Sequence, residues 1–312
     1  MKRVSFAEFG GPEVLRLTDD EEPHAGPHQV RIAVRAAGVN PVDWRNREGQ
    51  FRNARPVASP AEAGRRDGPT ELPSGVGQDA AGVVDEVGEG VEGISIGDRV
   101  FGRGSNTYAE FAVLWSWTRM PQDLTFEEAA GYPSVVETAL RILREVGVEA
   151  GQTLLVSGAS GGVGSAVLQI ARDRGITVIA TAGTANQDYL RGLGALATTY
   201  GEGWVERVRD LGSVDAALDL AGSGVIRELV ELTGDSQRVV SIADLSAPAF
   251  GVRFAGVGGN MFKALAEAVD LIERGKLRIP IEKSYTLAEA ANAHIDSQAG
   301  HTRGRRVITI LP

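Results

Sequence analysis

The chain has 312 residues, too many for one typical domain and enough for two. Its apolar fraction of 43% and charged fraction of 23% are those of an ordinary globular protein. The net charge is −9 without a basic cluster for nucleic acid, and the absence of cysteine excludes disulfides, cysteine-ligated zinc and a thiol nucleophile. No apolar run is long enough for a signal peptide or a membrane span, so we expect a cytoplasmic protein that binds neither membrane nor nucleic acid.

Short apolar runs separated by glycine, proline and aspartate fill residues 1–121 and are typical of a β-rich domain. Residues 78–98 carry two apolar runs broken by glycines, which predicts tight hairpins in a barrel-like sheet. Residues 54–75 are rich in proline, glycine, alanine and charge and predict a long exposed loop. The other strands predicted in this part cover residues 4–6, 14–17, 30–36 and 108–114.

From residue 124 onwards, helices and strands alternate, which predicts a doubly wound parallel sheet of the α/β class. An acidic first turn after Thr125 begins the first helix. Further helices are predicted over residues 134–146, 187–193, 204–211, 224–232, 261–274 and 287–296. Strands are predicted over residues 153–157, 176–181, 197–200, 216–220, 238–242, 252–255 and 306–310.

One stretch, residues 151–183, organises this part of the chain: GQTLLVSGASGGVGSAVLQIARDRGITVIATAG. It reads as strand, glycine-rich turn, helix and second strand, a βαβ unit. Without Cβ atoms at Gly161 and Gly162, the backbone can approach a pyrophosphate and direct N–H groups at it, at the positive end of the helix dipole. Gly164 lets the helix pack tightly on the strand behind it. Ala159 breaks the strict G-x-G-x-x-G spacing, but the context favours dinucleotide binding over a plain tight turn.

The end of the second strand favours NADP over NAD. An NAD site usually carries Asp or Glu there to hold the ribose 2′-hydroxyl. This chain has Thr181, Ala182, Gly183 and Asn186 there instead, with no acid. The missing carboxylate removes repulsion against a 2′-phosphate. Since that segment holds no Arg or Lys, hydroxyls and amides would have to bind the phosphate.

Six motifs are spread along nearly the whole chain: GVNPVD at residues 38–43, GQDAAG at 77–82, GDRV at 97–100, ETA at 137–139, the glycine turn at 158–164 and HTRG at 301–304. In composition and order they resemble the zinc-independent quinone oxidoreductase branch of the medium-chain dehydrogenase/reductases. The resemblance implies a GroES-like catalytic domain of residues 1–121 and 258–312. A Rossmann NADP-binding domain, residues 122–257, would be inserted into it, with the active site in the cleft. It also implies a homodimer.

The resemblance also bears on metal binding. Zinc-dependent relatives hold their catalytic metal with Cys, His and Glu, and this chain has Gln78 and Asp79 where they have His-Glu. The four-cysteine structural lobe is missing too. One carboxylate and one amide are poor ligands for Zn²⁺, so we expect metal-free chemistry.

The resemblance places two site residues. The asparagine matching Asn40 lies near the nicotinamide and the reacting carbonyl in similar proteins, and the threonine matching Thr138 lies at the nicotinamide ring. A tyrosine often follows that asparagine, but here none occurs before Tyr108, which leaves Tyr132 and solvent as alternative proton donors. Asp43 is a candidate to orient Asn40 or a water, although a loop hydrogen bond is the plainer interpretation.

Other candidates lie around the expected cleft. Trp44 is either a stacking surface for a flat substrate or a packing residue. Arg303 is either a phosphate contact or a solvated arginine before a strand. The ends of late strands are where ligands bind in open α/β sheets. The cofactor-binding candidates are Asn40, Thr138, Ser160, Gly161, Gly162, Val163, Thr181, Ala182, Gly183, Asn186, Tyr200, Ala221, Ile242, Ala243, Phe254 and Arg303.

We therefore expect an NADPH-dependent reductase that transfers hydride, without zinc, to a quinone or to the C=C bond of an enone. For an enone, Asn40 and nearby donors would stabilise the developing enolate oxygen. A bulky polyketide-like enone is a further possible substrate, because residues 54–75 could line a wide cleft. The alternative is a non-catalytic NADPH-binding redox sensor or structural protein, which the missing tyrosine favours. The short-chain class of reductases is set aside, since no tyrosine has lysine four residues later.

Overall fold

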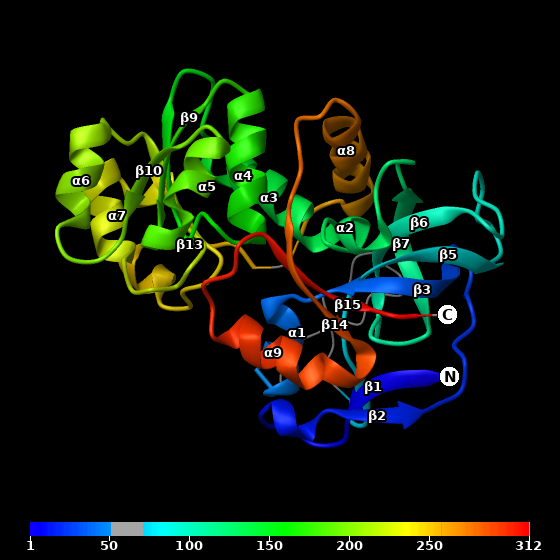
Figure 1. Cartoon of the computed structure of the whole chain (residues 1–312). Helices are drawn as coiled ribbons and strands as arrows, with labels where there is room; N and C mark the ends of the chain where they lie inside the picture. The colour runs from blue at the N-terminus through cyan, green and yellow to red at the C-terminus, as the bar shows by residue number, and fades with distance from the viewer. Residues whose placement is uncertain (51–70, 257, 312) are drawn as a thin grey trace.

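The computed structural model describes residues 1–50, 71–256 and 258–311. This part forms two lobes, with both termini on the β-rich lobe (Figure 1). One six-stranded sheet belongs to the β-rich lobe and another, flanked by helices, to the second lobe, while a three-stranded sheet completes the first. The predicted class is confirmed: a β-rich domain joined to a parallel Rossmann-type sheet.

The sheet of the β-rich lobe has the order β14-β15-β3-β5-β6-β7. Strand β3 also pairs with β7, so β3, β5, β6 and β7 close into the expected barrel-like ring. Its strands are β3 (Val30–Gly38), β5 (Asp79–Val87), β6 (Arg99–Ser105), β7 (Phe111–Arg119), β14 (Ile281–Thr286) and β15 (Arg305–Thr309). The small sheet holds β1 (Lys2–Phe6), β2 (Arg16–Asp19) and β4 (Ser74–Gly75).

Parts of this lobe differ from the prediction. The tight hairpins predicted for residues 78–98 are replaced by one wider hairpin, in which a loop over residues 88–98 joins β5 to the antiparallel strand β6. Gly90, Gly93 and Gly97 all have positive φ, which breaks extended structure, so Ile94 packs against the core from a loop. Residues 54–70 of the predicted exposed loop lie outside the described residues.

The second lobe contains a parallel sheet with the order β10-β9-β8-β11-β12-β13. Its strands are β8 (Thr153–Ser157), β9 (Thr177–Ala182), β10 (Leu196–Thr199), β11 (Ala216–Asp219), β12 (Val239–Ser241) and β13 (Arg253–Phe254). The helices of the chain are α1 (Pro41–Arg47), α2 (Phe126–Ala130), α3 (Pro133–Val146), α4 (Gly162–Asp173), α5 (Gln187–Gly192), α6 (Trp204–Leu211), α7 (Ile226–Thr233), α8 (Met261–Glu273) and α9 (Ala290–Gln298). Helix α1 and strands β4, β6 and β14 are not among the elements expected from the sequence.

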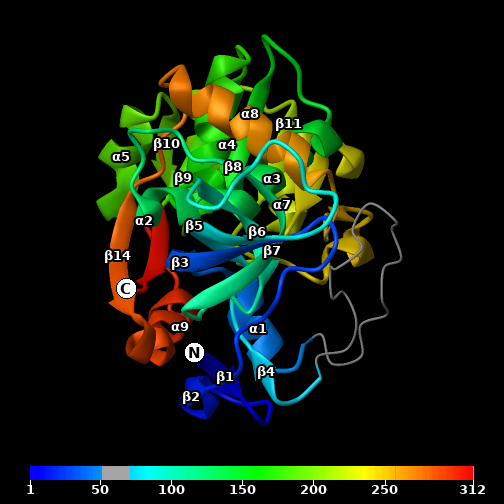
Figure 2. The same ribbon diagram turned by 90° about the vertical axis from the view of Figure 1, so that its right-hand side faces the viewer.

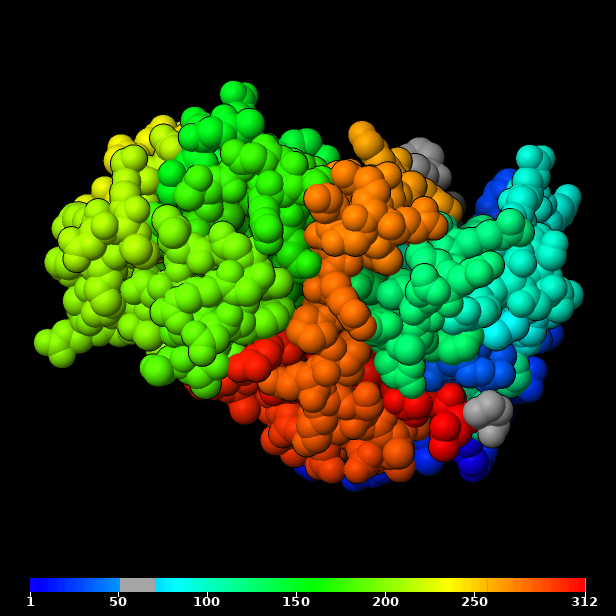
Figure 3. Space-filling model, turned by 45° about the horizontal axis from the view of Figure 1, so that its top comes forward, coloured from blue at the N-terminus to red at the C-terminus, as the bar shows by residue number. Residues whose placement is uncertain are grey.

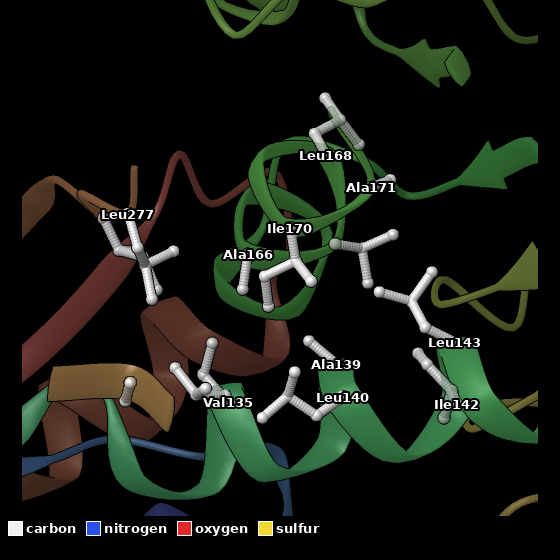
Figure 4. Close-up of a cluster of buried hydrophobic side chains, with 14 of the residues drawn as sticks. Val135, Ala139, Leu140, Ile142, Leu143, Ala166, Leu168, Ile170, Ala171 and Leu277 are labelled. Carbon is white, nitrogen blue, oxygen red and sulfur yellow. The ribbon is translucent and has the colours of Figure 1, made fainter. Parts of the chain in front are cut away.

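The largest apolar core lies around α3 and α4. Figure 4 shows side chains of the two helices, such as Ala139 and Ile170, directed toward each other. Helix α8 packs on α3 and contributes Leu265 and Leu271 to the same core. It also touches β7, where the rings of Trp117 and Phe262 lie 5.5 Å apart edge to face.

The last part of the chain returns to the β-rich lobe. Strands β14 and β15 join the sheet of that lobe, while the preceding helix α8 packs on the core of the other. Figure 3 shows this orange segment between the lobes, and Figure 2 shows β14 beside the red strand β15. The predicted domain boundaries at residues 121 and 258 stay predictions. No helix among the described residues combines the length and apolarity that a membrane crossing requires.

Candidate functional site

One large cavity, with a volume of about 1640 Å³, is lined by both lobes. The glycine turn and the ends of the parallel strands line one side, and the segment after β3 lines the other. The C-terminal stretch closes a third side: Gly304 forms a bridge with Gly161, and its N–H donates to the Ser160 carbonyl at 2.9 Å. Residues far apart in sequence are thereby held on one wall.

The glycine turn has space on the cavity side and tight packing on the other. A Cβ built on Gly161 would meet only the Gly158 carbonyl, 4.0 Å away, whereas one on Gly164 would lie 2.3 Å from the Ala159 carbonyl oxygen. Gly161 is the N-cap of α4 and has no side chain to satisfy the first N–H groups of that helix. The start of α4 is therefore open to the cavity at Gly161, where an anion could approach the first N–H groups of the helix.

A second polar group gathers at the end of β9. The Arg303 guanidinium donates through Nε to the Asn186 side chain at 3.0 Å and through Nη2 to the Ala185 carbonyl at 2.8 Å. The Tyr200 side chain is half-exposed, and its hydroxyl lies 3.4 Å from an idealised Cβ on Gly183. The segment after β9 contains no Arg or Lys of its own, and Arg303 places a positive charge beside it.

The third part of the site is the segment between β3 and α1. Asn40 is the N-cap of α1, Pro41 occupies the first turn, and Asp43 completes a capping box. The Asn40 N–H donates to Asp43 Oδ2 at 2.8 Å, and the Tyr108 hydroxyl donates to the same oxygen at 3.2 Å. The bond from the Asn40 N–H is the loop hydrogen bond considered for Asp43, and it fixes the backbone of Asn40.

Two charged groups hold the side-chain amide of Asn40. Its Nδ2 donates to Asp79 Oδ2 at 2.9 Å, and its Oδ1 accepts from Arg305 Nη2 at 2.9 Å. Asp79 is itself held by Ser134, through the hydroxyl at 2.6 Å and the N–H at 3.2 Å. A carboxylate only accepts and a guanidinium only donates, so the amide has one orientation and keeps one free N–H. Asn40 lines the cavity and is 5% exposed.

Burial raises the pKa of Asp43 to about 7, because desolvation of the carboxylate and the charge of Asp79 outweigh the hydrogen bonds from Asn40 and Tyr108. The folded protein therefore holds a proton that the unfolded chain, with an aspartate pKa near ~3.9, has lost. The free energy of unfolding from this group falls as pH rises between those two values, by at most about 1.4 kcal/mol per pH unit.

Replacing Asp43 with asparagine should remove this contribution. The free energy of unfolding of the wild type minus that of Asp43→Asn should then fall as pH rises from about 5 to about 8. Chemical denaturation of both proteins at each pH measures the difference and cancels the other titrating groups, including buried His294. A difference that stays constant with pH would show that Asp43 is ionised throughout.

Comparisons with known proteins place this arrangement in a family. A model of the alcohol dehydrogenase GroES-like domain matches residues 26–116, and a model described as zinc-binding dehydrogenase matches residues 193–308. A quinone oxidoreductase of Pseudomonas aeruginosa is 32% identical over 337 residues, covering 98% of this chain and 99% of the relative. The chain belongs to the medium-chain dehydrogenase/reductase family, in its quinone oxidoreductase-like branch.

Two other members broaden the comparison. A 2-methylene-furan-3-one reductase of Solanum lycopersicum is 31% identical over 331 residues, covering 100% of this chain and 80% of the relative. A mycobacterial structure solved in complex with NADPH has a TM-score of 0.81 and 30% identity, covering 99% of this chain and 100% of that chain. As a member of this family, the protein is an oxidoreductase.

Most of the predicted cofactor-binding residues line the one cavity. They are Asn40, Thr138, Ser160, Gly161, Gly162, Val163, Thr181, Ala182, Gly183, Asn186, Tyr200, Ala221, Ile242, Ala243 and Phe254. Arg303 is not part of the lining and lies behind Asn186, to which it donates. Trp44 lines the cavity, with its indole N–H on the Ser297 hydroxyl at 3.2 Å and the Arg45 guanidinium 5.3 Å from its ring.

Tyr132 does not lie where a proton donor for this cavity would have to lie. The residue is 1% exposed, its ring packs edge to face on Phe101, and it is absent from the cavity lining. Its hydroxyl accepts a hydrogen bond from the Ile279 N–H at 3.3 Å. Tyr132 is therefore not placed to act as the proton donor considered from the sequence. It lies at the N-cap of α3, and its side chain is buried in the apolar core. Asp43, which is also absent from the lining, acts as a helix cap.

Three polar residues of the site are not among the predicted ones: Asp79, Ser134 and Arg305. Asp79 stands out in the sequence only as the replacement for a zinc ligand, and Arg305 follows directly after the HTRG motif. A buried arginine such as Arg305 needs an acceptor, and buried carboxylates such as Asp43 and Asp79 need a donor. A search of the sequence for opposite charges in strand-like segments would have paired Arg305 with Asp79. Glu137 and Arg141, which form a buried ion pair at 3.0 Å on α3, also line the cavity.

Proposed function

We propose that the protein is an NADPH-dependent oxidoreductase that reduces quinones or the C=C bond of α,β-unsaturated carbonyl compounds without a metal. One observation carries the proposal: a single cavity joins the glycine turn to the clamped amide of Asn40. Its volume of about 1640 Å³ exceeds the ~300–1,000 Å³ of ordinary ligand pockets, which leaves space for a dinucleotide and a second molecule.

The residues of the cavity fit NADPH. The N–H groups at the start of α4 would hold the pyrophosphate, in the space that a side chain at Gly161 would fill. Asn186, Tyr200 and the nearby Arg303 would hold the 2′-phosphate, with the guanidinium balancing its charge. Thr138 and the ends of β12 and β13 line the part of the cavity proposed for the nicotinamide.

Replacing Arg303 with methionine should lower the affinity for NADPH about ten- to a hundredfold and leave that for NADH nearly unchanged. A hydrogen bond to a charged group contributes about 1.5–3 kcal/mol, and NADH lacks the phosphate that would make it. Fluorescence titration with both nucleotides measures the two affinities. Arg191→Met is the matched control, because Arg191 is a surface arginine paired with Asp188 on α5. An equal loss for both nucleotides would exclude Arg303 from the phosphate site.

In this proposal Asn40 acts on the oxygen of the substrate. When bound, NADPH supplies the hydride for the reduction. Negative charge then develops on the carbonyl or quinone oxygen, and the free N–H of the Asn40 amide donates to it. Because Asp79 and Arg305 hold the amide in advance, little reorganisation is needed as the charge appears. Neither Tyr108 nor Tyr132 lines the cavity, so we propose that the final proton comes from solvent.

The donor set supports chemistry without zinc. Among the described residues, no group of three or more His, Cys, Asp or Glu side chains is placed to hold a metal ion. The Asp79 carboxylate already accepts from Ser134 and Asn40, and the Gln78 side-chain oxygen accepts from Arg103. Binding a cation there would break these hydrogen bonds while offering few suitable ligands.

Turnover with a small substrate panel tests the proposal. The loss of NADPH absorbance would be followed with a benzoquinone, a naphthoquinone, a linear enal and a cyclic enone, and repeated with NADH. NADPH-selective oxidation with any of these supports the reductase and ranks its substrates. NADPH binding without turnover on the whole panel would favour the redox sensor or structural protein, which the absence of Tyr108 and Tyr132 from the cavity lining keeps open.

Two further predictions are not tested by the structure. We propose a homodimer, which rests on the family resemblance, and a cytoplasmic location, which rests on the sequence analysis above. A bulky polyketide-like enone stays a possible substrate, but most of the loop on which that idea depends lies outside the described residues.

A further inference from the structure

Arg305 touches the two parts of the site at once. Its side chain passes the glycine turn, where an idealised Cβ on Gly162 would lie 2.6 Å from Arg305 Cδ. Its guanidinium then reaches the amide of Asn40, to which Nη2 donates at 2.9 Å. Arg305 is 5% exposed, so both contacts are shielded from water, and the hydrogen bond to Asn40 is stronger there than at a surface.

The amide of Asn40 needs this contact to keep its orientation. Asp79 alone holds one N–H and leaves the amide free to tilt about that bond. The Arg305 guanidinium holds the carbonyl oxygen on the opposite side, so the amide is restrained at two points. Arg305 also stays 3.9 Å from Asp79, which balances the buried carboxylate.

We propose that Arg305 is a positioning residue for the reduction: it turns the carbonyl oxygen of Asn40 away from the substrate and leaves the second amide N–H for the substrate oxygen. The inference rests on the function proposed above. Without Arg305, the donor would lose its alignment while the glycine turn would still offer its N–H groups to the cofactor. The chemical step should therefore suffer more than NADPH binding.

A double-mutant cycle tests this role. Arg305→Met and Arg305→Lys would each be made in the wild type and in the Asn40→Ala background, and kcat and the NADPH affinity measured for all of them. Misplacing a reacting group by about 1 Å can cost about a hundredfold in rate, so each change should lower kcat about ten- to a hundredfold in the wild type. Neither should lower it further once Asn40 is alanine.

An arginine outside the cavity provides the control. Arg278→Met removes an exposed guanidinium whose partner is Glu128, at 3.2 Å, and should leave kcat close to that of the wild type. If Arg305→Met does not fold, Arg305→Lys and Asp79→Asn complete the same cycle, since Asp79 holds the other end of the amide.

The outcomes separate the two proposals. Equal losses of kcat in both backgrounds would overturn the positioning role, because Arg305 would then act independently of Asn40. A loss confined to NADPH affinity, with kcat unchanged, would overturn it as well. If Asn40→Ala itself leaves turnover unchanged, the assignment of Asn40 fails, and if the substrate panel shows no turnover, the proposed function fails first.

Discussion

Replacing Asn40 with alanine should lower kcat/KM for the NADPH-dependent reduction about a hundred- to a thousandfold. Removing one preorganised donor to a developing oxyanion has effects of this size in other enzymes. The amide is held by Asp79 and Arg305 in a buried place, where a hydrogen bond to a forming negative charge is strong. Steady-state kinetics with the best substrate of the panel measures the loss.

Two controls accompany the Asn40 variant. Val42→Ala changes the same segment and the same cavity wall, but it removes only apolar contact and should lower kcat/KM far less. NADPH affinity and thermal unfolding of Asn40→Ala show whether the buried Asp79 and Arg305 have rearranged. A variant that folds, binds NADPH and turns over like the wild type would remove Asn40 from the mechanism.

Replacing Gly164 with alanine should lower the free energy of unfolding by about 3 kcal/mol, a large loss for a single methyl group. The new Cβ would lie 2.3 Å from the carbonyl oxygen of Ala159 and 2.6 Å from its Cα. Both are backbone atoms of the glycine turn, so no side chain can move aside to make room. Helix α4 would have to shift away from the strand on which it packs.

Gly161→Ala is the matched control, three residues earlier in the same turn. Its Cβ would approach nothing closer than 4.0 Å, and φ at this position is −71°, which alanine adopts readily. Its cost should be about 1 kcal/mol or less. Urea denaturation of both variants gives the comparison, and equal stabilities would show that the turn tolerates a side chain at Gly164.

The sequence predicted those parts of the site that depend on neighbouring residues. A buried strand, three closely spaced glycines and an amphipathic helix form a local pattern, and the positions from Ser160 to Val163 line the cavity as expected. The absence of an acid after β9 is equally local. The sequence also marks Arg303 as a candidate phosphate contact, but it does not place Arg303 beside Asn186, because the two residues are 117 positions apart and their contact depends on the fold.

The hydrogen bonds that hold the Asn40 amide, to Asp79 and from Arg305, were not predicted for the same reason. Asn40 and Arg305 are 265 positions apart, and their contact depends on strand register: Gly38 stands opposite Asp79 on β5 and opposite Val307 on β15. A shift of one residue in either pairing would direct these side chains to the other face. Tyr132 was predicted wrongly for a similar reason. Its position before Pro133 is visible in the sequence, but its burial depends on how α3 packs against the rest of the protein.

The pairing of β15 with β3 has a consequence for how the protein matures on the ribosome. One edge of residues 36–38 stays unpaired until residues 307–309 have been made, because β15 is their partner there. Domains generally fold from the N-terminus as they emerge, so the parallel sheet has all its strands before the first lobe is closed. The segment that carries Asn40 directly follows this open edge, and Arg305 arrives with the strand that closes it. A nascent chain is thus without the proposed reactive centre until β15 has been made, even when the parallel sheet has already folded.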